Sequence, residues 1–374
     1  MKQTYPSFYP LFQCTASQCS DNCCIGWEID IDPETYSFYQ THPFDSPDLG
    51  NRFQTQISDD FPPHFLLDEK ERCPFLNQKN LCDIYSTFGE NHLCEICAEH
   101  PRFHEWFGDE KESGLGLCCE EAVRLLLSSC EPISFCSKEI GEEADTVPFN
   151  PSVLSAVRNL RQKLFALLQN RNFPLYQRFQ GVLTVAKELE EIYSSSPCSN
   201  ESKLKELTPS APFYFGVDTS PCLGALREIL RFLQTLEPID PKWHSRLADL
   251  SQNLPTLLEQ REAFIAACQD SFFEYEHLSV YFLYRYLLKS VRDDNAFAYL
   301  ILSVFTPLFL FLLNLQSFTQ QGNLSEQDII TNIKAFSKEI EYSEENLQAL
   351  LEEFCCNPAL SPELFIKLCS ALLA

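Results

Sequence analysis

The sequence predicts a mostly α-helical protein, in which a loop-rich N-terminal domain with a cysteine–metal cluster is followed by an all-helical domain. Two observations carry this prediction. Glycine is sparse, at 11 of 374 residues, and phenylalanine is abundant, at 31, which favours helices over tightly turned sheets. No run alternates apolar and polar residues over the length that a large sheet needs.

Cysteine content divides the chain into two parts. Twelve of the 18 cysteines lie in residues 1–136. We expect a cysteine-rich metal-cluster domain over 1–136, a polar and acidic linker over 137–151, and a helical domain over 152–374. A chain of this length buries a sizeable apolar core without cross-links, so the cysteines require an explanation other than stability.

The predicted elements follow in order along the chain. Residues 33–72 are rich in Pro, Asp and Ser, and predict loops and short helical turns. EEAVRLLLSS, residues 120–129, is the first helical pattern. Apolar residues at three- and four-residue steps then predict helical structure over 153–170, 176–193, 223–236, 255–291, 296–315 and 325–355.

The stretch at 296–315, AFAYLILSVFTPLFLFLLNL, is the most apolar of these segments. It holds no charged residue over about one bilayer's length of helix, so a membrane helix is one interpretation. Its near flank, RDDN, is acidic, and no cluster of Lys and Arg lies on either side to orient a span. These flanks favour a buried core helix, and we expect no membrane partner.

The formal net charge of −25 is concentrated toward the N-terminus. Residues 1–150 carry 9 Lys and Arg against 27 Asp and Glu. This acidity argues against nucleic acid as a partner, because phosphate binding needs a basic face. It suits a cationic partner, such as a lysine-rich protein segment or a positively charged small molecule, and it equally suits plain solubility.

The first residues, MKQTYPSFYPLFQC, contain one Lys and no apolar run of the length that a signal peptide needs. We therefore expect a cytoplasmic protein in a reducing compartment. In such a compartment, clustered cysteines are more often metal ligands or redox groups than disulfides.

The early cysteines gather in three short segments. These read CTASQCSDNCC at 14–24, CPFLNQKNLCDIYSTFGENHLCEIC at 73–97 and LCCEEA at 117–122. Thiolates bind zinc or the iron of an iron–sulfur cluster, and four ligands from distant loops suffice once the chain folds. One C-x2-C knuckle stands beside irregular spacings, which favours iron–sulfur and leaves zinc as the alternative.

Several of these motifs together resemble the flagellin lysine N-methylase family. They are CTASQCSDNCCIGWEIDIDPETY, CPFLNQKNLCDIYSTFGENHLCEICAEHPRF and LCCEEAVRLLL, and later FLYRYLLKSVRDDNAF and FSKEIEYSEENLQAL, which resemble that family's C-terminal signature. The resemblance implies transfer of methyl groups from S-adenosylmethionine to lysine side chains of flagellin. It also implies an iron–sulfur cluster of the 4Fe-4S type bound by cysteines. It names no catalytic residue.

Carried over by position, the resemblance implies eight cysteine ligands, of which a four-iron cluster needs four. These are Cys14, Cys19, Cys23, Cys24, Cys73, Cys82, Cys97 and Cys119. Cys94 and Cys118 stand outside this set, and Glu120 stands where the family usually has Pro. Which four of the eight bind the cluster stays open.

Methyl transfer needs a neutral lysine amine, and desolvation in an aromatic pocket lowers the pKa of lysine from its usual ~10.4. The densest aromatic run, FFEYEHLSVYFLYRY at 272–286, supplies either such a pocket or ordinary core packing. The candidate substrate- or cofactor-binding residues are Trp27, Asp30, Glu341, Glu345 and Asn346. Glu341 and Glu345 are four residues apart, so we expect them to share one helix face.

A second function remains open from the sequence. The pattern CPFL…CDIY…C…HPR also resembles a broader group of small zinc- or iron-chelating cysteine-cluster proteins. In that case the chain would be a non-enzymatic metal-cluster protein that senses iron or docks a protein partner through its helical domain.

Overall fold

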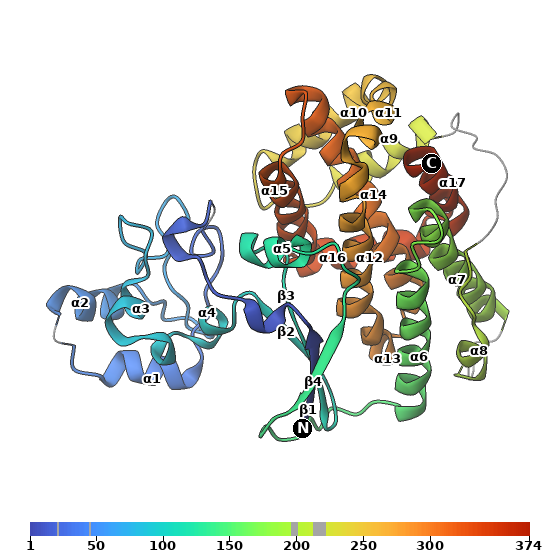
Figure 1. Cartoon of the computed structure of the whole chain (residues 1–374). Helices are drawn as coiled ribbons and strands as arrows, with labels where there is room; N and C mark the ends of the chain where they lie inside the picture. Colours follow the sequence, from blue (N-terminus) through green and yellow to red (C-terminus); the bar gives the residue numbers. More distant parts are fainter. Residues whose placement is uncertain (21, 45, 196–200, 212–221) are drawn as a thin grey trace.

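The protein forms a cysteine-rich lobe, a small β-sheet and a large helical bundle, with the sheet between the other two (Figure 1). The computed structural model describes residues 1–20, 22–44, 46–195, 201–211 and 222–374. Helices dominate these residues, which confirms the predicted mostly α-helical fold.

The lobe lies between β1 and β2 in the chain and has an apolar core of its own. Its helices are α1 (Pro33–Thr41), α2 (Pro47–Thr55), α3 (Asp83–Phe88) and α4 (Glu95–Glu99). Asp32 begins α1, because its carboxylate accepts hydrogen bonds from the amides of Thr35 at 2.9 Å and Glu95 at 2.8 Å. This residue therefore ties the start of α1 to the start of α4. The largest buried rings of the lobe are those of Tyr39, Phe53, Phe65 and Phe75.

A four-stranded sheet connects the lobe to the bundle. Its strands lie in the order β2 (Arg102–Phe107), β3 (Glu110–Leu115), β1 (Lys2–Pro6) and β4 (Phe135–Glu139). β1 is parallel to β3 and antiparallel to β4, while β2 and β3 form an antiparallel hairpin. Residues 137–139, at the start of the predicted linker, therefore lie in the sheet.

The sequence of β3, EKESGL, is charged, and yet the strand is largely buried. Its charged residues can be buried because they are paired. Glu112 accepts two hydrogen bonds from the Arg161 guanidinium, at 2.8 and 2.6 Å, and both side chains are under 10% exposed. Lys111 pairs with Glu142 at 2.9 Å. These partners offset the cost of removing the charges from water.

The bundle begins after Asn150, whose side chain accepts hydrogen bonds from the first amides of α6. Before it, α5 (Glu120–Leu127) lies between the sheet and the bundle (Figure 1). The bundle helices are α6 (Pro151–Leu168), α7 (Leu175–Ser195), α8 (Glu201–Glu206), α9 (Cys222–Leu233), α10 (Trp243–Glu259), α11 (Arg261–Cys268), α12 (Phe273–Tyr286), α13 (Ser290–Asp293), α14 (Ala296–Gln321), α15 (Glu326–Phe336), α16 (Glu344–Cys356) and α17 (Pro362–Leu373). The predicted helical stretch at 255–291 is thus divided among α10, α11, α12 and α13.

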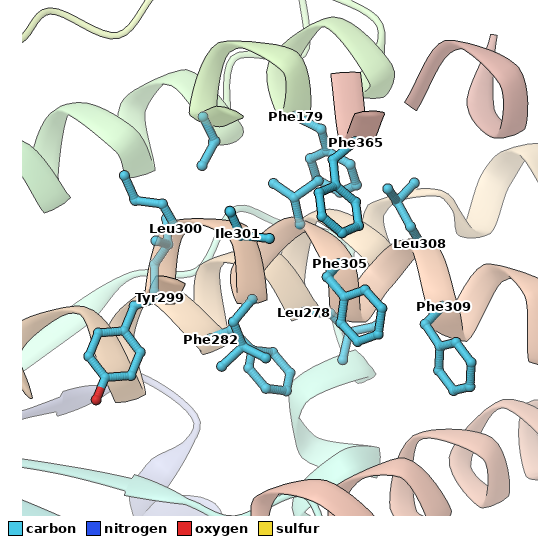
Figure 2. Packing of buried hydrophobic residues seen from close by; sticks show 14 of the residues in the cluster. Phe179, Leu278, Phe282, Tyr299, Leu300, Ile301, Phe305, Leu308, Phe309 and Phe365 are labelled. Atoms are coloured by element: carbon cyan, nitrogen blue, oxygen red, sulfur yellow. The ribbon is translucent and has the colours of Figure 1, made fainter. Parts of the chain in front are cut away.

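Helix α14 forms the centre of the bundle, where it packs against α7, α12, α15, α16 and α17. Every residue from Ala296 to Ser317 is buried. Figure 2 shows its side chains meeting those of neighbouring helices, and the rings of Phe305 and Phe365 lie 6.1 Å apart between centroids. Among the described residues, α14 is the one helix long and apolar enough to cross a membrane, yet its most apolar window is completely buried inside the protein. The prediction of a buried core helix is confirmed.

Buried apolar residues form two separate clusters. One lies in the lobe, from Ile29 to Cys94. The other fills the bundle and also includes Phe107 at the end of β2. Residues of α5 belong to it too, because α5 packs against α12 and α15. The division into domains at residue 136 stays a prediction. Apolar residues up to Cys97 pack in the lobe cluster, and those from Phe107 onward pack in the bundle cluster.

Candidate functional site

Five cysteines pack into the core of the lobe, and we call them the lobe thiols. They are Cys24, Cys73, Cys82, Cys94 and Cys97. The Cys73 amide donates to the Cys24 carbonyl at 2.8 Å, Cys82 lies at the start of α3, and the thiols of Cys94 and Cys97 hydrogen-bond each other at α4. Segments far apart in the sequence therefore bring sulfur atoms to one place, as a thiolate metal site requires.

A second group lies where the first cysteine segment meets α5, and we call Cys19, Cys23 and Cys119 the bridge thiols. The Cys19 thiol donates to Glu120 Oε2 at 3.6 Å. Ser20 donates to the same oxygen from its amide, at 2.9 Å, and from its hydroxyl. Burial raises the pKa of Glu120, but the hydrogen bonds that it accepts outweigh this and lower its pKa to about 2. The charged Glu120 thus fastens the first cysteine segment to α5, directly beside Cys119.

The remaining early cysteines lie outside these two groups. Cys14 is exposed, and its sulfur accepts a hydrogen bond from the Ala16 amide at 3.4 Å. Cys118 is buried and turns toward the bundle, where it hydrogen-bonds with Tyr342. Of the eight cysteines that the family resemblance implies, four are lobe thiols and three are bridge thiols.

Burial raises the pKa of Cys73 and Cys82 among the lobe thiols and of Cys119 among the bridge thiols, whereas the hydrogen bond with Cys97 lowers the pKa of Cys94. The pKa of Cys73 rises to about 12, and the neighbouring thiols of Cys82 and Cys94 add to the increase. The pKa of Cys119 also rises to about 12, with the other two bridge thiols adding. Since both thiols are protonated at neutral pH, a metal ion that binds them must displace protons.

In neither group do three sulfur atoms lie within 4.8 Å of one another. Among the described residues, the one set of three metal-binding atoms within 4.8 Å of one another is Glu28, Asp30 and His64, so no three thiols approach that closely.

A buried charged centre lies on the face of the bundle that meets the sheet. We call it the tyrosine centre, and it consists of Tyr281, Arg285, Tyr286, Glu341 and Tyr342. Glu341 Oε1 accepts hydrogen bonds from the hydroxyls of Tyr281, at 3.2 Å, and Tyr286, at 3.0 Å. It also pairs with Arg285 at 3.0 Å, with the carboxylate side chain fully buried and the guanidinium side chain 11% exposed. The guanidinium lies over the rings of Tyr286 and Tyr342, at 5.3 and 5.4 Å from their centroids.

Helix α12 and a π-helical turn position the tyrosine centre. Tyr281 and Arg285 are four residues apart on α12, so they share a face. Glu341 ends the π-helical turn Ser337–Glu341, which separates α15 from α16. Such turns are rare and frequently accompany functional sites. This turn brings a carboxylate to the buried face of α12.

Tyr342 joins the tyrosine centre to the lobe and to the sheet. Its ring meets that of Trp27 edge-on, at 5.5 Å between centroids, and lies 6.4 Å from that of His100. Its hydroxyl lies against Gly116, two residues before Cys118 in the sequence. Burial lowers the pKa of His100 to about 4, so this imidazole is neutral at pH 7. Three parts of the molecule therefore meet at one tyrosine.

One oxygen of Glu341 has no hydrogen-bond partner among the described residues. This atom, Oε2, is buried, as is the indole nitrogen of Trp27, which likewise lacks a partner there. A buried carboxylate oxygen without a partner is costly unless something else binds it. Beside aromatic faces, such an acceptor suits an alkylammonium or a sulfonium cation. The tyrosine centre thus combines the Arg285 guanidinium with a buried carboxylate that has one oxygen without a partner among the described residues.

Two of the five predicted substrate- or cofactor-binding residues lie at or beside this centre, namely Glu341 and Trp27. Asp30 lies apart from it, exposed beside Glu28 and His64. The side-chain amide of Asn346, at the start of α16, donates two hydrogen bonds of 2.8 Å to backbone carbonyls. These hydrogen bonds stabilise the local fold.

The expectation that Glu341 and Glu345 share a helix face is wrong. Glu341 ends the π-helical turn and is buried, whereas Glu345 is exposed in the first turn of α16. Ser343 begins a new helix between them, because its hydroxyl accepts from the Asn346 amide at 3.2 Å. A four-residue spacing therefore does not align the two carboxylates.

Sequence reasoning did not single out Arg285, Tyr342 or Cys118. Tyr281 and Tyr286 lie in the aromatic run at 272–286, which the sequence allowed to be either a binding pocket or ordinary core packing. Most of that run is buried packing, and these two tyrosines reach Glu341. One feature of the sequence could have indicated Arg285. It is the one charged residue within the apolar run FLYRYLL, and a charged residue on a buried helix needs a partner of opposite charge.

A polar cavity of about 330 Å³ lies elsewhere, between α10, α14 and α15. Its lining residues are Arg246, Asp249, Gln316, Ser317, Gln320, Asp328, Thr331 and Asn332. It shares no residue with the tyrosine centre or with either group of thiols.

Comparison with known proteins places the bundle in a described family. Residues 161–358 match the family model of the FliB lysine N-methylase C-terminal domain, so the match includes the whole tyrosine centre. The chain is 27% identical over 221 residues to the lysine-N-methylase of Salmonella typhimurium, and equally to that of Salmonella choleraesuis. Each of these alignments covers 51% of this chain and 52% of the relative, so the chain spans about half the length of these curated relatives.

A flagellar protein is also similar to this chain. The flagellar biosynthetic protein FliU of Salmonella muenchen is 28% identical over 144 residues, which is 36% of this chain and 83% of that protein. No solved structure matches the chain.

Proposed function

The chain belongs to the FliB lysine N-methylase family, and we propose that it is an enzyme that methylates lysine side chains of a protein substrate. One structural observation carries the proposal. Glu341, inside the segment that matches the family, is buried among tyrosines with one oxygen lacking a partner among the described residues. A carboxylate so placed is suited to receive a lysine side chain and its proton.

We propose flagellin as the substrate and S-adenosylmethionine as the methyl donor. The name of one relative, the flagellar biosynthetic protein FliU, supports a flagellar substrate. The net charge of −25 favours the approach of a cationic, lysine-bearing protein segment. S-adenosylmethionine would supply the methyl group from a sulfonium, a cation that suits the aromatic rings and carboxylate of the tyrosine centre.

The tyrosine centre would make the substrate amine reactive. A lysine ammonium has no lone pair with which to form a bond to a methyl group, so it must first lose a proton. Glu341 Oε2 is positioned to accept that proton, since Oε1 is already occupied by the hydroxyls of Tyr281 and Tyr286. The surrounding rings exclude water, which lowers the pKa of a bound lysine and leaves its amine neutral.

The tyrosines and Arg285 keep this carboxylate in place. Burial raises the pKa of Tyr281 and of Tyr286 well above the usual range. The positive charge of Arg285 lowers both pKa values, and the negative charge of Glu341 raises them, but burial has the largest effect. Both hydroxyls therefore stay protonated and donate to Oε1. The buried guanidinium compensates the charge of the carboxylate in a setting that water does not reach.

We further propose that the cysteines bind an iron–sulfur cluster of the four-iron type, with zinc as the alternative. Methyl displacement needs no electron, so the cluster would act by fixing the fold of the lobe. The lobe carries Trp27, whose ring contacts Tyr342, so an ordered lobe would complete one wall of the tyrosine centre. The described cysteines form no disulfide among themselves, which fits a reducing, cytoplasmic location.

The test is transfer of label from methyl-labelled S-adenosylmethionine to purified monomeric flagellin by the full chain, purified without oxygen. We expect label on lysine side chains, located by mass spectrometry as mass increments of one or more methyl groups. Flagellin with chemically acetylated lysines is the matched control, since it offers the same protein without a free amine. Absence of label from protein that retains its metal would reject the proposal and support a non-enzymatic metal-cluster protein.

A further inference from the structure

We infer that the polar cavity between α10, α14 and α15 binds a zwitterionic α-amino acid group, with Arg246 holding its carboxylate and Asp249 holding its ammonium. The inference goes beyond the proposed function, because the cavity shares no residue with the tyrosine centre. The volume of the cavity, about 330 Å³, falls within the range of small-molecule sites, which begins at roughly 300 Å³.

Arg246 on α10 supplies the group that would bind a carboxylate. Its guanidinium has several N–H donors, and among the described residues it donates one hydrogen bond, to the side-chain oxygen of Asn332. Burial lowers the pKa of Arg246, and no charged neighbour in the described part of the chain counteracts this change. By contrast, Arg161 and Arg285, which are also buried, each pair with a carboxylate. The free donors of Arg246 therefore suit an anionic group that enters from outside.

A chain of buried amides fixes the position of Arg246. Asn332 on α15 is 2% exposed, and its amide donates to Asn314 Oδ1 on α14 at 2.8 Å. The Asn314 amide donates in turn to the hydroxyl of Tyr275 on α12 at 2.9 Å. A guanidinium held in one orientation in this way loses little freedom when it binds a carboxylate through two parallel hydrogen bonds.

Asp249 supplies the group that would bind an ammonium. It lies three residues after Arg246 on α10, so both side chains reach the same cavity. Its carboxylate accepts hydrogen bonds from the side-chain amides of Gln316 at 2.7 Å, Gln320 at 3.2 Å and Asn253 at 2.9 Å. A carboxylate has about four acceptor sites, so one remains for a ligand. The cavity thus offers a guanidinium and a carboxylate that amides, rather than each other, hold in place.

The charges around the cavity favour a zwitterion over a simple anion. Asp328, in the first turn of α15, also lines the cavity, so one guanidinium faces the ligand together with two carboxylates. Phosphate would be attracted by the one and repelled by the other two. An α-amino acid carries a carboxylate and an ammonium on the same carbon atom, so it complements both signs. Free amino acids have this group, and so does one end of S-adenosylmethionine.

The test is isothermal titration calorimetry of the full chain, purified without oxygen, with each of the common free L-amino acids and, separately, with S-adenosylmethionine. We expect one of these ligands to bind the wild type, and both Arg246→Gln and Asp249→Asn to weaken that binding by about 10- to 100-fold, since each variant replaces a charge-assisted hydrogen bond by a neutral one. Arg231→Gln is the matched control, because this arginine is exposed on α9 and lies outside the cavity. It should bind with the affinity of the wild type.

Two further ligands test the zwitterion itself. Acetate and methylammonium each carry one of the two charges, and each should bind at least about tenfold more weakly than the α-amino acid. Binding of a free amino acid would assign the cavity to a ligand other than the methyl donor. Binding of S-adenosylmethionine alone, weakened by Arg246→Gln, would assign the cavity to the amino-acid end of the donor.

The inference is overturned if no α-amino acid ligand binds, if Arg246→Gln binds as tightly as the wild type, or if phosphate or acetate binds as tightly as the best α-amino acid. If Arg246→Gln does not fold, Thr331→Phe decides. Thr331 lines the cavity and is exposed, so a ring there would obstruct the cavity without disturbing the core. Wild-type affinity in Thr331→Phe would then place the ligand elsewhere.

Discussion

The hydroxyl of Tyr342 lies so close to Gly116 that a Cβ atom added at residue 116 would approach it within 3.0 Å. Side chains essentially never show so short a contact, so the absence of a side chain at this position makes room for the tyrosine. The loop between β3 and Cys118 therefore helps to set where Tyr342 meets Trp27 and Arg285.

We expect Gly116→Ala to displace the Tyr342 ring and to reduce methyl transfer to flagellin at least about tenfold, since small misplacements at a reacting centre cost up to about 100-fold. Overpacking of this kind should lower the free energy of unfolding by about 1–3 kcal/mol. Initial rates and urea unfolding measure the two effects. Gly141→Ala is the control, because a Cβ there meets nothing within 4 Å. A Gly116→Ala enzyme with the wild-type rate would contradict the role given to Tyr342.

Glu341→Gln retains the shape of the side chain and removes its charge. We expect the rate of lysine methylation to fall by about 100-fold or more, because the amide is a poor proton acceptor and Arg285 loses its counter-charge. Circular dichroism checks that the variant is folded. Glu345→Gln, four residues away and exposed, should methylate at the wild-type rate. Equal rates for the two variants would show that Glu341 has no part in the reaction.

Glu274 on α12 makes stability depend on pH. Burial raises the pKa of this carboxyl from 4.5 to about 7, and Glu326 adds to the increase. The folded protein therefore holds this proton more tightly than the unfolded chain, so the stabilisation is present below about pH 4.5 and is lost as the pH rises through 7. Between pH 5 and pH 8, the wild type should lose about 1–3 kcal/mol more unfolding free energy than Glu274→Gln.

Urea unfolding at the two pH values measures this difference. Glu262→Gln is the matched control, since the Glu262 side chain is 91% exposed, and this variant should follow the wild type. If Glu274→Gln showed the same pH dependence as the wild type, Glu274 would not be the titrating group.

The buried ion pair between Glu112 and Arg161 joins the sheet to α6. Glu112→Gln would leave a guanidinium without its counter-charge at a site where that side chain is 3% exposed. We expect a loss of about 3–5 kcal/mol of unfolding free energy. Glu110→Gln breaks a partly exposed pair with Arg158 and should cost less than about 1 kcal/mol. Similar costs for the two variants would show that burial does not decide the strength of these pairs.

The helices were predictable because their apolar residues recur at helical steps. The stretch at 296–315 is an example: its uncharged run left a membrane helix open, and its acidic flank favoured the core helix that the structure shows. The sheet was less accessible to sequence reasoning. Glu112 and Lys111 on β3 look like surface residues, and their burial depends on Arg161 and Glu142, which come later in the chain.

The candidate site was predictable in part for the same reason. Glu341 and Trp27 were candidates from the sequence, whereas Glu345 was not distinguishable from Glu341, because no local pattern revealed the π-helical turn. The grouping of the thiols also depends on long-range contacts. The contact of Cys19 with Glu120 spans 101 residues, and spacing within either segment carries no information about it.

Helix α14 also has a consequence for biosynthesis. As the ribosome releases this segment, the nascent chain exposes a stretch that is long and apolar enough to enter a lipid bilayer. Its contact helices α7 and α12 are synthesised earlier, whereas α15, α16 and α17 follow. The emerging helix therefore meets part of its final surroundings at once, and prompt docking there keeps it away from both lipid and other unfinished chains.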